Sequence, residues 1–283
     1  MEKRNPDFAG SWYPATASEC RRLIQEFSAT KPSLPSTAPA HGGIVPHAGW
    51  FYSGKIAANV IKYISATSRP ETVVITGRHL HVGSARYIMK EGLWATPLGD
   101  VEVDAGLAEA LMSQFSFTVE TATDYEQDNT IELQLPFIKY FLADAKILPI
   151  GVPPNPTAVD VGRAVVACAE TLGRKIAILG STDLTHYGVN YGYTPKGTGQ
   201  GAVDWVKHEN DRRIVELMVN MDPVGVLREA DRNHNACCSG AAAAAIAASR
   251  ELGAGRGVKL VYSTSFDTRP DSSFVGYTGI VYE

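Results

Sequence analysis

The chain has 283 residues, enough to bury a full hydrophobic core as one large α/β domain or two small ones. Hydrophobic residues make up 45% and charged residues 20%, an ordinary composition for a globular protein. The net charge of -4 argues against nucleic acid or an anionic membrane surface as a partner. We expect a cytoplasmic protein, because the sequence contains no apolar stretch of membrane-spanning length and no signal-peptide core.

Short apolar runs alternate with stretches of helical periodicity along the chain. Residues 7–14 are predicted to be extended or turning, residues 18–27 helical, and residues 28–40 a surface loop. Strands are predicted at 42–46, 71–76, 146–152, 175–179, 258–264 and 275–282, and helices at 53–64, 105–113, 130–141, 157–172, 207–220 and 239–251. This order predicts one α/β domain over residues 1–283, with a largely parallel or mixed sheet covered by helices on both faces.

Histidine is scarce in this chain, and its placement is the main functional signal. Four of the seven histidines follow three of the predicted strands. His47 follows the first of them, His79 and His81 follow the second, and His186 follows the strand over 175–179. In open α/β sheets, ligands bind beyond the carboxyl ends of the strands, so we expect the functional site there.

Each of these histidines also has a simpler interpretation. His47 could satisfy a loop carbonyl instead of a ligand. His79 and His81 would share one face of an extended segment, where one could bind a metal while the other forms hydrogen bonds, or both could lie in a solvated turn. Asp183 could orient His186 or another group, or it could belong to the first turn of a helix.

The four cysteines are too few and too irregularly spaced for a disulfide framework. Cys20 and Cys168 are predicted to be buried structural thiols. Cys237 and Cys238 precede an alanine-rich helix, whose N-terminus would favour a thiolate as ligand or nucleophile. One cysteine of this pair is expected to be a small buried hydrophobic residue.

Imidazoles and a thiolate form the ligand set of zinc, copper or iron rather than of magnesium or calcium. The sequence contains no C-x-x-C pair, which argues against a structural zinc module. A site collected from separate strands is instead typical of catalytic metal centres.

Several segments, in order along most of the chain, resemble the MEMO family, which includes the B component of the AmmeMemoRadiSam system. They are residues 8–14, 46–50, 52–54, 96–100, 129–136 and 181–188. The resemblance implies a fold similar to that of class III extradiol dioxygenases, which are non-haem iron enzymes. It also implies that His47 and Cys237 are metal ligands, that His186 is an acid/base, and that Asp183 is its neighbour in the motif.

Two motifs depart from the family pattern. Leu80 stands where the family has the first histidine of a His-His pair, His81 matches the second, and His79 is an additional histidine. Asn129 replaces the histidine of a second motif. Either His79 or His81 supplies the missing ligand through a local shift, or metal binding is weakened or lost.

The leading hypothesis is a metal-dependent redox enzyme that resembles non-haem iron dioxygenases and acts on a small aromatic or related molecule. Its metal, with iron preferred over copper or zinc, would be held by His47, His79 or His81, and Cys237, while His186 moves protons. One alternative is a non-catalytic metal-binding or protein-interaction member of the family. Another is a hydrolase with Cys237 as nucleophile and His186 as base. We expect a small-molecule substrate and leave a homo-oligomer open.

Overall fold

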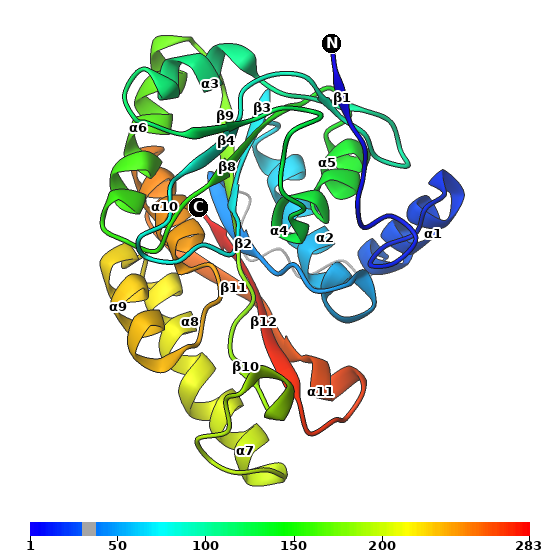
Figure 1. Cartoon of the computed structure of the whole chain (residues 1–283), viewed down its shortest axis with the longest axis vertical. Coiled ribbons are helices and arrows are strands. Elements are labelled where there is room, and N and C mark those ends of the chain that lie inside the picture. The colour runs from blue at the N-terminus through cyan, green and yellow to red at the C-terminus, as the bar shows by residue number, and fades with distance from the viewer. Residues whose placement is uncertain (30–37) are drawn as a thin grey trace.

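The computed structural model describes residues 1–29 and 38–283 (Figure 1). Most of the loop predicted at 28–40 therefore lies outside the described residues.

A mixed sheet forms the centre of the molecule. Its strands follow the order β10-β12-β2-β9-β3-β8-β4-β7, with β11 paired to β12. The central pairs β2–β9, β9–β3 and β3–β8 are parallel, whereas β12 and β4 join the parallel set through antiparallel pairs. The strands are β2 (Gly42–Val45), β3 (Thr72–Gly77), β4 (Tyr87–Met89), β7 (Thr118–Glu120), β8 (Lys146–Gly151), β9 (Ile176–Ser181), β10 (His186–Tyr187), β11 (Gly257–Thr264) and β12 (Phe274–Tyr282). A small second sheet contains β1 (Lys3–Arg4), β5 (Leu93–Trp94) and β6 (Val101–Glu102).

Helices cover both faces of the central sheet, as Figure 1 shows. One face packs against α3 (Ala105–Met112), α6 (Thr157–Thr171), α8 (Asp211–Val219), α9 (Pro223–Asn233) and α10 (Ser239–Glu251). The other packs against α1 (Ala17–Ser28), α2 (Trp50–Thr67), α4 (Asn129–Glu132) and α5 (Leu135–Phe141). Successive strand residues point to opposite faces, so Val74 lies in the first core and Val73 in the second. The predicted α/β fold with helices on both faces is confirmed.

The predicted and observed elements differ mainly where local signals interrupt a longer pattern. The helix predicted over 130–141 is two helices, α4 and α5, and Pro136 occupies the first turn of α5. The prediction omitted α9, although Asp222 caps its first turn and Pro223 begins it. It also omitted α7 (Gln200–Trp205), α11 (Ser265–Thr268) and the short strands β1, β4, β5, β6, β7 and β10.

Small side chains allow α10 to lie very close to its neighbours. The run Ala241–Ala245 is fully buried. A side chain at Gly162 of α6 would collide with the Ala244 carbonyl, and one at Gly180 of β9 would collide with Ala245. The hydroxyl of Thr76 in β3 also donates to the Ala241 carbonyl at 2.8 Å. The N-terminus of α10 is thereby held against the ends of β3 and β9.

In the part of the chain that the structure describes, no helix is both long and apolar enough to cross a membrane.

Candidate metal centre

The sheet order brings three histidine-containing segments to one edge. β9 lies between β2 and β3, and all three strands are parallel. The chain that follows β2 therefore meets the chain that follows β3 across the end of β9. His47 lies two residues after β2, and His79 lies two residues after β3.

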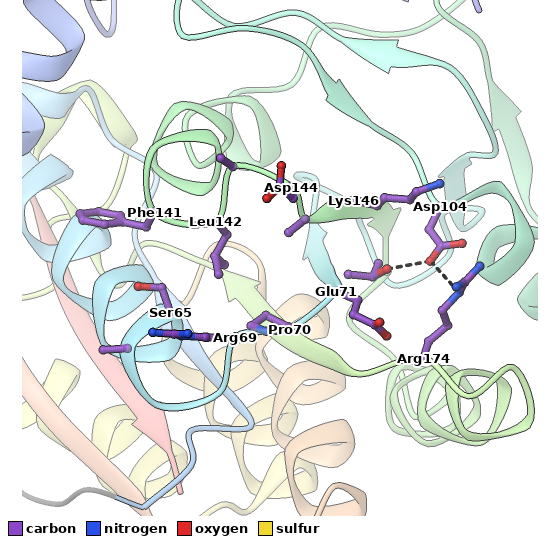
Figure 2. A pocket seen from close by; sticks show the side chains of 14 residues that line it. Ser65, Arg69, Pro70, Glu71, Asp104, Phe141, Leu142, Asp144, Lys146 and Arg174 are labelled. Atoms are coloured by element: carbon purple, nitrogen blue, oxygen red, sulfur yellow. Dashed lines mark hydrogen bonds and ion pairs between the residues drawn. The ribbon is translucent and has the colours of Figure 1, made fainter.

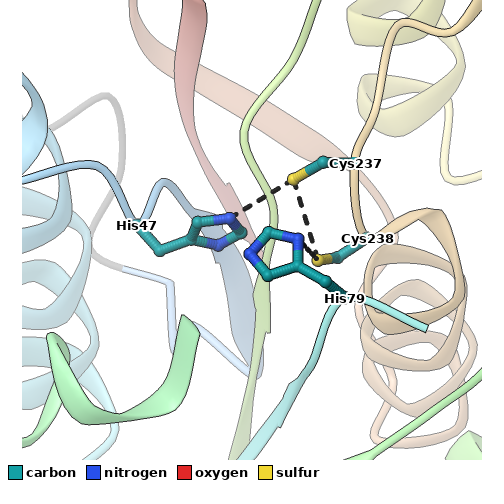
Figure 3. A group of neighbouring side chains, drawn as sticks. All are labelled: His47, His79, Cys237 and Cys238. Carbon is teal, nitrogen blue, oxygen red and sulfur yellow. Dashed lines mark hydrogen bonds between the residues drawn. The ribbon is translucent and has the colours of Figure 1, made fainter. Parts of the chain in front are cut away.

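Four side chains converge at this edge: His47, His79, Cys237 and Cys238. Figure 3 shows the two imidazoles facing the two thiols, which come from the segment entering α10. One ligand atom from each of the four residues lies within 4.8 Å of the others. Cys237 Sγ is 3.3 Å from His47 Nε2, Cys238 Sγ is 3.6 Å from His79 Nδ1, and the two sulfurs are 3.7 Å apart.

The orientation of the buried His47 ring is set by β9. The Ser181 hydroxyl donates to the Thr130 carbonyl at 2.7 Å, and it lies 3.0 Å from His47 Nδ1. Because the Ser181 proton is used on the carbonyl, His47 Nδ1 carries a proton and donates it to Ser181 Oγ. His47 Nε2 is therefore the nitrogen that can bind a metal.

The main chain of His47 is also fixed by polar contacts. Asp183 accepts its backbone N–H at 2.8 Å, and Asn129 donates to its carbonyl at 2.9 Å. Asp183 was predicted to orient His186 or another group. In the structure, its carboxylate orients the His47 segment. Asn129 therefore acts on the same segment as Asp183.

The pKa values of His47, Cys237 and Cys238 depend on one another, because the three groups lie in contact. Burial would lower the pKa of His47, but Asp183 and the Cys237 thiolate raise it to about 9. Burial opposes ionisation of Cys237, but the hydrogen bond from Cys238 and the neighbouring imidazoles hold its pKa well below the usual range. Burial and the adjacent Cys237 raise the pKa of Cys238. The lowered pKa of Cys237 and the raised pKa of His47 both favour a thiolate beside an imidazolium, and a metal cation would replace the proton between them.

A tight turn after β3 selects His79 rather than His81. Arg78 has a φ of 73°, and the Leu80 N–H donates to the Arg78 carbonyl at 3.0 Å. This turn directs His79 to the cluster. His81 is exposed and begins a second turn, where its N–H donates to Ser84 Oγ at 3.0 Å. Of the histidines predicted as ligands, the structure brings together His47 and His79 but not His81.

The unusual backbone of Arg78 is held in place by its buried side chain. Its guanidinium forms ion pairs with Glu120 and Glu126 and lies 4.1 Å from the centre of the Tyr87 ring. The backbone N–H of Arg78 donates to Thr130 Oγ1 at 2.8 Å. A left-handed conformation in a non-glycine residue persists only where its surroundings fix it. These contacts provide that constraint.

The two cysteines have different positions. Cys237 is half-buried, and its Sγ accepts the Asp183 N–H at 3.3 Å. Cys238 is buried, as expected for one member of the pair, but its sulfur faces His79 and Cys237. Cys238 was not predicted as a donor, although it is adjacent to Cys237 in the sequence. Cys20 and Cys168 are buried and free, as predicted.

A cavity of about 670 Å³ opens beside the cluster. Its lining includes His47, His79, Asp183 and His186, together with the aromatic residues Trp12, Phe51, Tyr52, Tyr191 and Tyr277. His186 Nδ1 lies 3.2 Å from the Leu184 carbonyl and donates to it, so its Nε2 is free to accept a proton. His186 and Asp183 therefore lie at the same cavity as the cluster, on chain that follows β9.

A second cavity, of about 750 Å³, lies at the opposite end of the parallel strands (Figure 2). Its described lining holds no histidine or cysteine. The buried Asp104 there accepts the Thr72 hydroxyl at 2.7 Å and pairs with Arg174 at 3.7 Å. Asp104 is thus already partnered, and the described lining of this cavity contains no histidine–cysteine donor set like the one at the carboxyl edge.

The fold and the cluster define an α/β protein with a histidine–cysteine candidate metal centre at the carboxyl edge of its sheet. A family model described as Memo-like protein matches residues 4–281, and the chain belongs to this MEMO family. It is 35% identical to a MEMO1 family protein of Methanopyrus kandleri and 36% identical to one of Thermococcus kodakarensis, each over 99% of both chains.

A solved structure shows a related fold. It is the crystal structure of an uncharacterized protein from Escherichia coli K12, with a TM-score of 0.51 and 12% identity. The match covers 80% of this chain and 92% of the other.

Proposed function

We propose that this protein is a metal-dependent redox enzyme that resembles non-haem iron extradiol-type dioxygenases and acts on a small aromatic or related molecule. The observation that carries the proposal is the cavity lined by His47, His79 and His186, with the Cys237 sulfur 3.3 Å from His47 Nε2. A metal-binding cluster, a proton acceptor and a space for substrate are thereby combined in one site.

The donor set fits a transition metal. Imidazole and thiolate ligands suit iron, copper and zinc, and the fixed tautomer of His47 presents Nε2 to the cation. His47, His79 and Cys237 would hold the metal. An iron ion bound there would supply the redox chemistry that allows dioxygen to react with an organic substrate.

The remaining residues would bind the substrate and move its protons. His186 Nε2 would accept a proton from a substrate hydroxyl, while the Nδ1–H bond to Leu184 keeps the ring in the required tautomer. Tyr52, Tyr191 and Tyr277 line the cavity and can pack against a planar ring. Asp183 would keep the His47 segment in position.

A second candidate is a metal-handling protein without turnover. Cys238 favours it, because a fourth protein donor reduces the number of metal positions open to substrate. The hydrolase alternative has less support. It pairs Cys237 with His186, whereas the imidazoles beside Cys237 in the structure are those of His47 and His79.

Anaerobic loading with ferrous iron tests the proposed site. Wild-type protein should bind iron stoichiometrically and consume dioxygen with catechol or its carboxylate derivative. His79→Ala should lose both properties, whereas the matched variant His81→Ala, two residues away and exposed, should retain both. His186→Gln should keep the iron and lose dioxygen uptake. Iron retention by His79→Ala equal to that of wild type would contradict the assigned ligands.

A further inference from the structure

We propose that Cys238 is a fourth metal ligand, so that the cluster is a two-histidine, two-cysteine site that binds the thiophilic ions zinc and copper(I) more tightly than ferrous iron. This inference rests on the proposed metal site and concerns its ligand number and metal selectivity. It assigns a ligand role to a residue for which burial alone would suggest only packing.

The spacing of the donor atoms supports tetrahedral coordination. Zinc binds sulfur at about 2.3 Å and nitrogen at about 2.0–2.1 Å, so the edges of a regular tetrahedron are about 3.8 Å between sulfurs and about 3.6 Å between sulfur and nitrogen. The two sulfurs of Cys237 and Cys238 are 3.7 Å apart. The Cys238–His79 and Cys237–His47 separations are 3.6 and 3.3 Å. These three of the six edges match the tetrahedron within a few tenths of an ångström, and the other three are no longer than 4.8 Å.

Rigid elements fix the position of the Cys238 sulfur. The Cys238 N–H donates to Thr182 Oγ1 at 3.0 Å, immediately after β9. The next residue begins α10, which the Thr76–Ala241 hydrogen bond and the alanine packing hold against the sheet. Ligands on rigid elements need little reorganisation to bind a metal. Cys238 is thus held ready to ligate.

The direction of the side chain also distinguishes a ligand from a packing residue. Cys238 is only 3% exposed, and the polar partners of its sulfur are the Cys237 sulfur and the His79 ring nitrogen. Both of these atoms belong to the candidate donor set. A second thiolate shifts the preference of such a site toward thiophilic ions and fills a position that a substrate would otherwise use.

Cobalt(II), which reports thiolate ligation by its sulfur-to-metal charge-transfer absorption, provides the test. Wild-type protein, kept anaerobic and reduced, should bind cobalt with the intense visible bands of a tetrahedral site. Cys238→Ala and the conservative Cys238→Ser should bind with roughly half the charge-transfer intensity and should lose preference for zinc over ferrous iron. Cys168→Ala, a buried cysteine in α6, should behave as wild type.

The outcomes separate this inference from the proposed enzymatic function. If Cys238→Ser is folded by circular dichroism and keeps the wild-type charge-transfer intensity while Cys237→Ser loses it, Cys238 is not a ligand and the inference is wrong. Dioxygen uptake by the iron-loaded wild type would still support the proposed function in that case. Conversely, a halved charge-transfer band with no dioxygen uptake would support the inference and contradict the enzymatic proposal.

Discussion

Ser181 shows how a single hydroxyl sets the chemistry of the cluster. It donates to the Thr130 carbonyl and accepts from His47 Nδ1, so one side chain fixes both the tautomer and the direction of a candidate metal-binding ring. All three residues are buried, so the two hydrogen bonds are largely shielded from solvent.

Ser181→Ala should therefore weaken metal binding. Loss of such a supporting hydrogen bond typically lowers metal affinity by about 10- to 100-fold. The substitution also leaves the Thr130 carbonyl and the His47 Nδ1–H without the Ser181 hydroxyl as a partner. We expect this to lower the free energy of unfolding by about 1–3 kcal/mol. A zinc competition titration and urea unfolding would measure the two effects. Unchanged zinc affinity in a folded Ser181→Ala protein would contradict the role of Ser181.

At the scale of elements, α4 anchors the N-terminal segment. The buried carboxylate of Glu132 accepts the backbone N–H groups of Asp7 and Phe8 at 2.9 and 2.8 Å, and the Tyr13 hydroxyl at 2.9 Å. Trp12, which lines the cavity, lies within the segment held in this way. The acidic residue of α4 therefore positions one wall of the cavity.

Glu132→Gln should release this segment. An amide presents one acceptor oxygen and an NH₂ group that would face donors, so we expect a loss of about 1–3 kcal/mol in stability. Hydrogen exchange should accelerate in residues 7–13. Glu102→Gln is the control, because its pair with Lys146 is half-exposed and contributes little. Equal exchange in the two variants would show that Glu132 does not hold the segment.

At the scale of the whole molecule, Asp211 joins three parts of the fold. It lies at the start of α8, accepts the Thr185 N–H at 3.1 Å in the chain that follows β9, and accepts the Tyr262 hydroxyl of β11 at 2.8 Å. Complete burial raises its pKa to about 7, because the hydrogen bonds only partly offset the loss of water.

This raised pKa predicts a pH-dependent stability. Between the usual carboxyl pKa of about 4 and the folded value, the native state holds a proton that the unfolded state releases. Asp211 therefore stabilises the protein less as pH rises, by about 1.4 kcal/mol per pH unit within that window. Asp211→Asn, which imitates the protonated form, should remove this slope in urea unfolding followed from about pH 5 to about pH 7. Parallel pH profiles for the two proteins would contradict the prediction.

The sequence by itself predicted the α/β fold, the residues placed at the strand ends, and the candidate donors His47, His79 or His81, and Cys237. Such features are local, because strand periodicity and strand-end position are encoded by neighbouring residues. The sequence left open whether His79 or His81 belongs to the site, because Leu80 separates the two. The choice depends on the left-handed backbone of Arg78, and this backbone is held by ion pairs of Arg78 with residues more than 40 positions away.

Only the tertiary structure decided the composition of the cluster. It placed His79 with His47, left His81 outside the cluster, and brought the Cys238 sulfur to the imidazoles. The contact between His47 and Cys237 joins residues 190 positions apart, and it exists because parallel strands end at one edge against the N-terminus of α10. The periodicity of apolar residues in the sequence indicates which face of a strand or helix a residue occupies. The distance between His47 and Cys237 is instead set by how closely the alanine-rich helix α10 packs on the sheet.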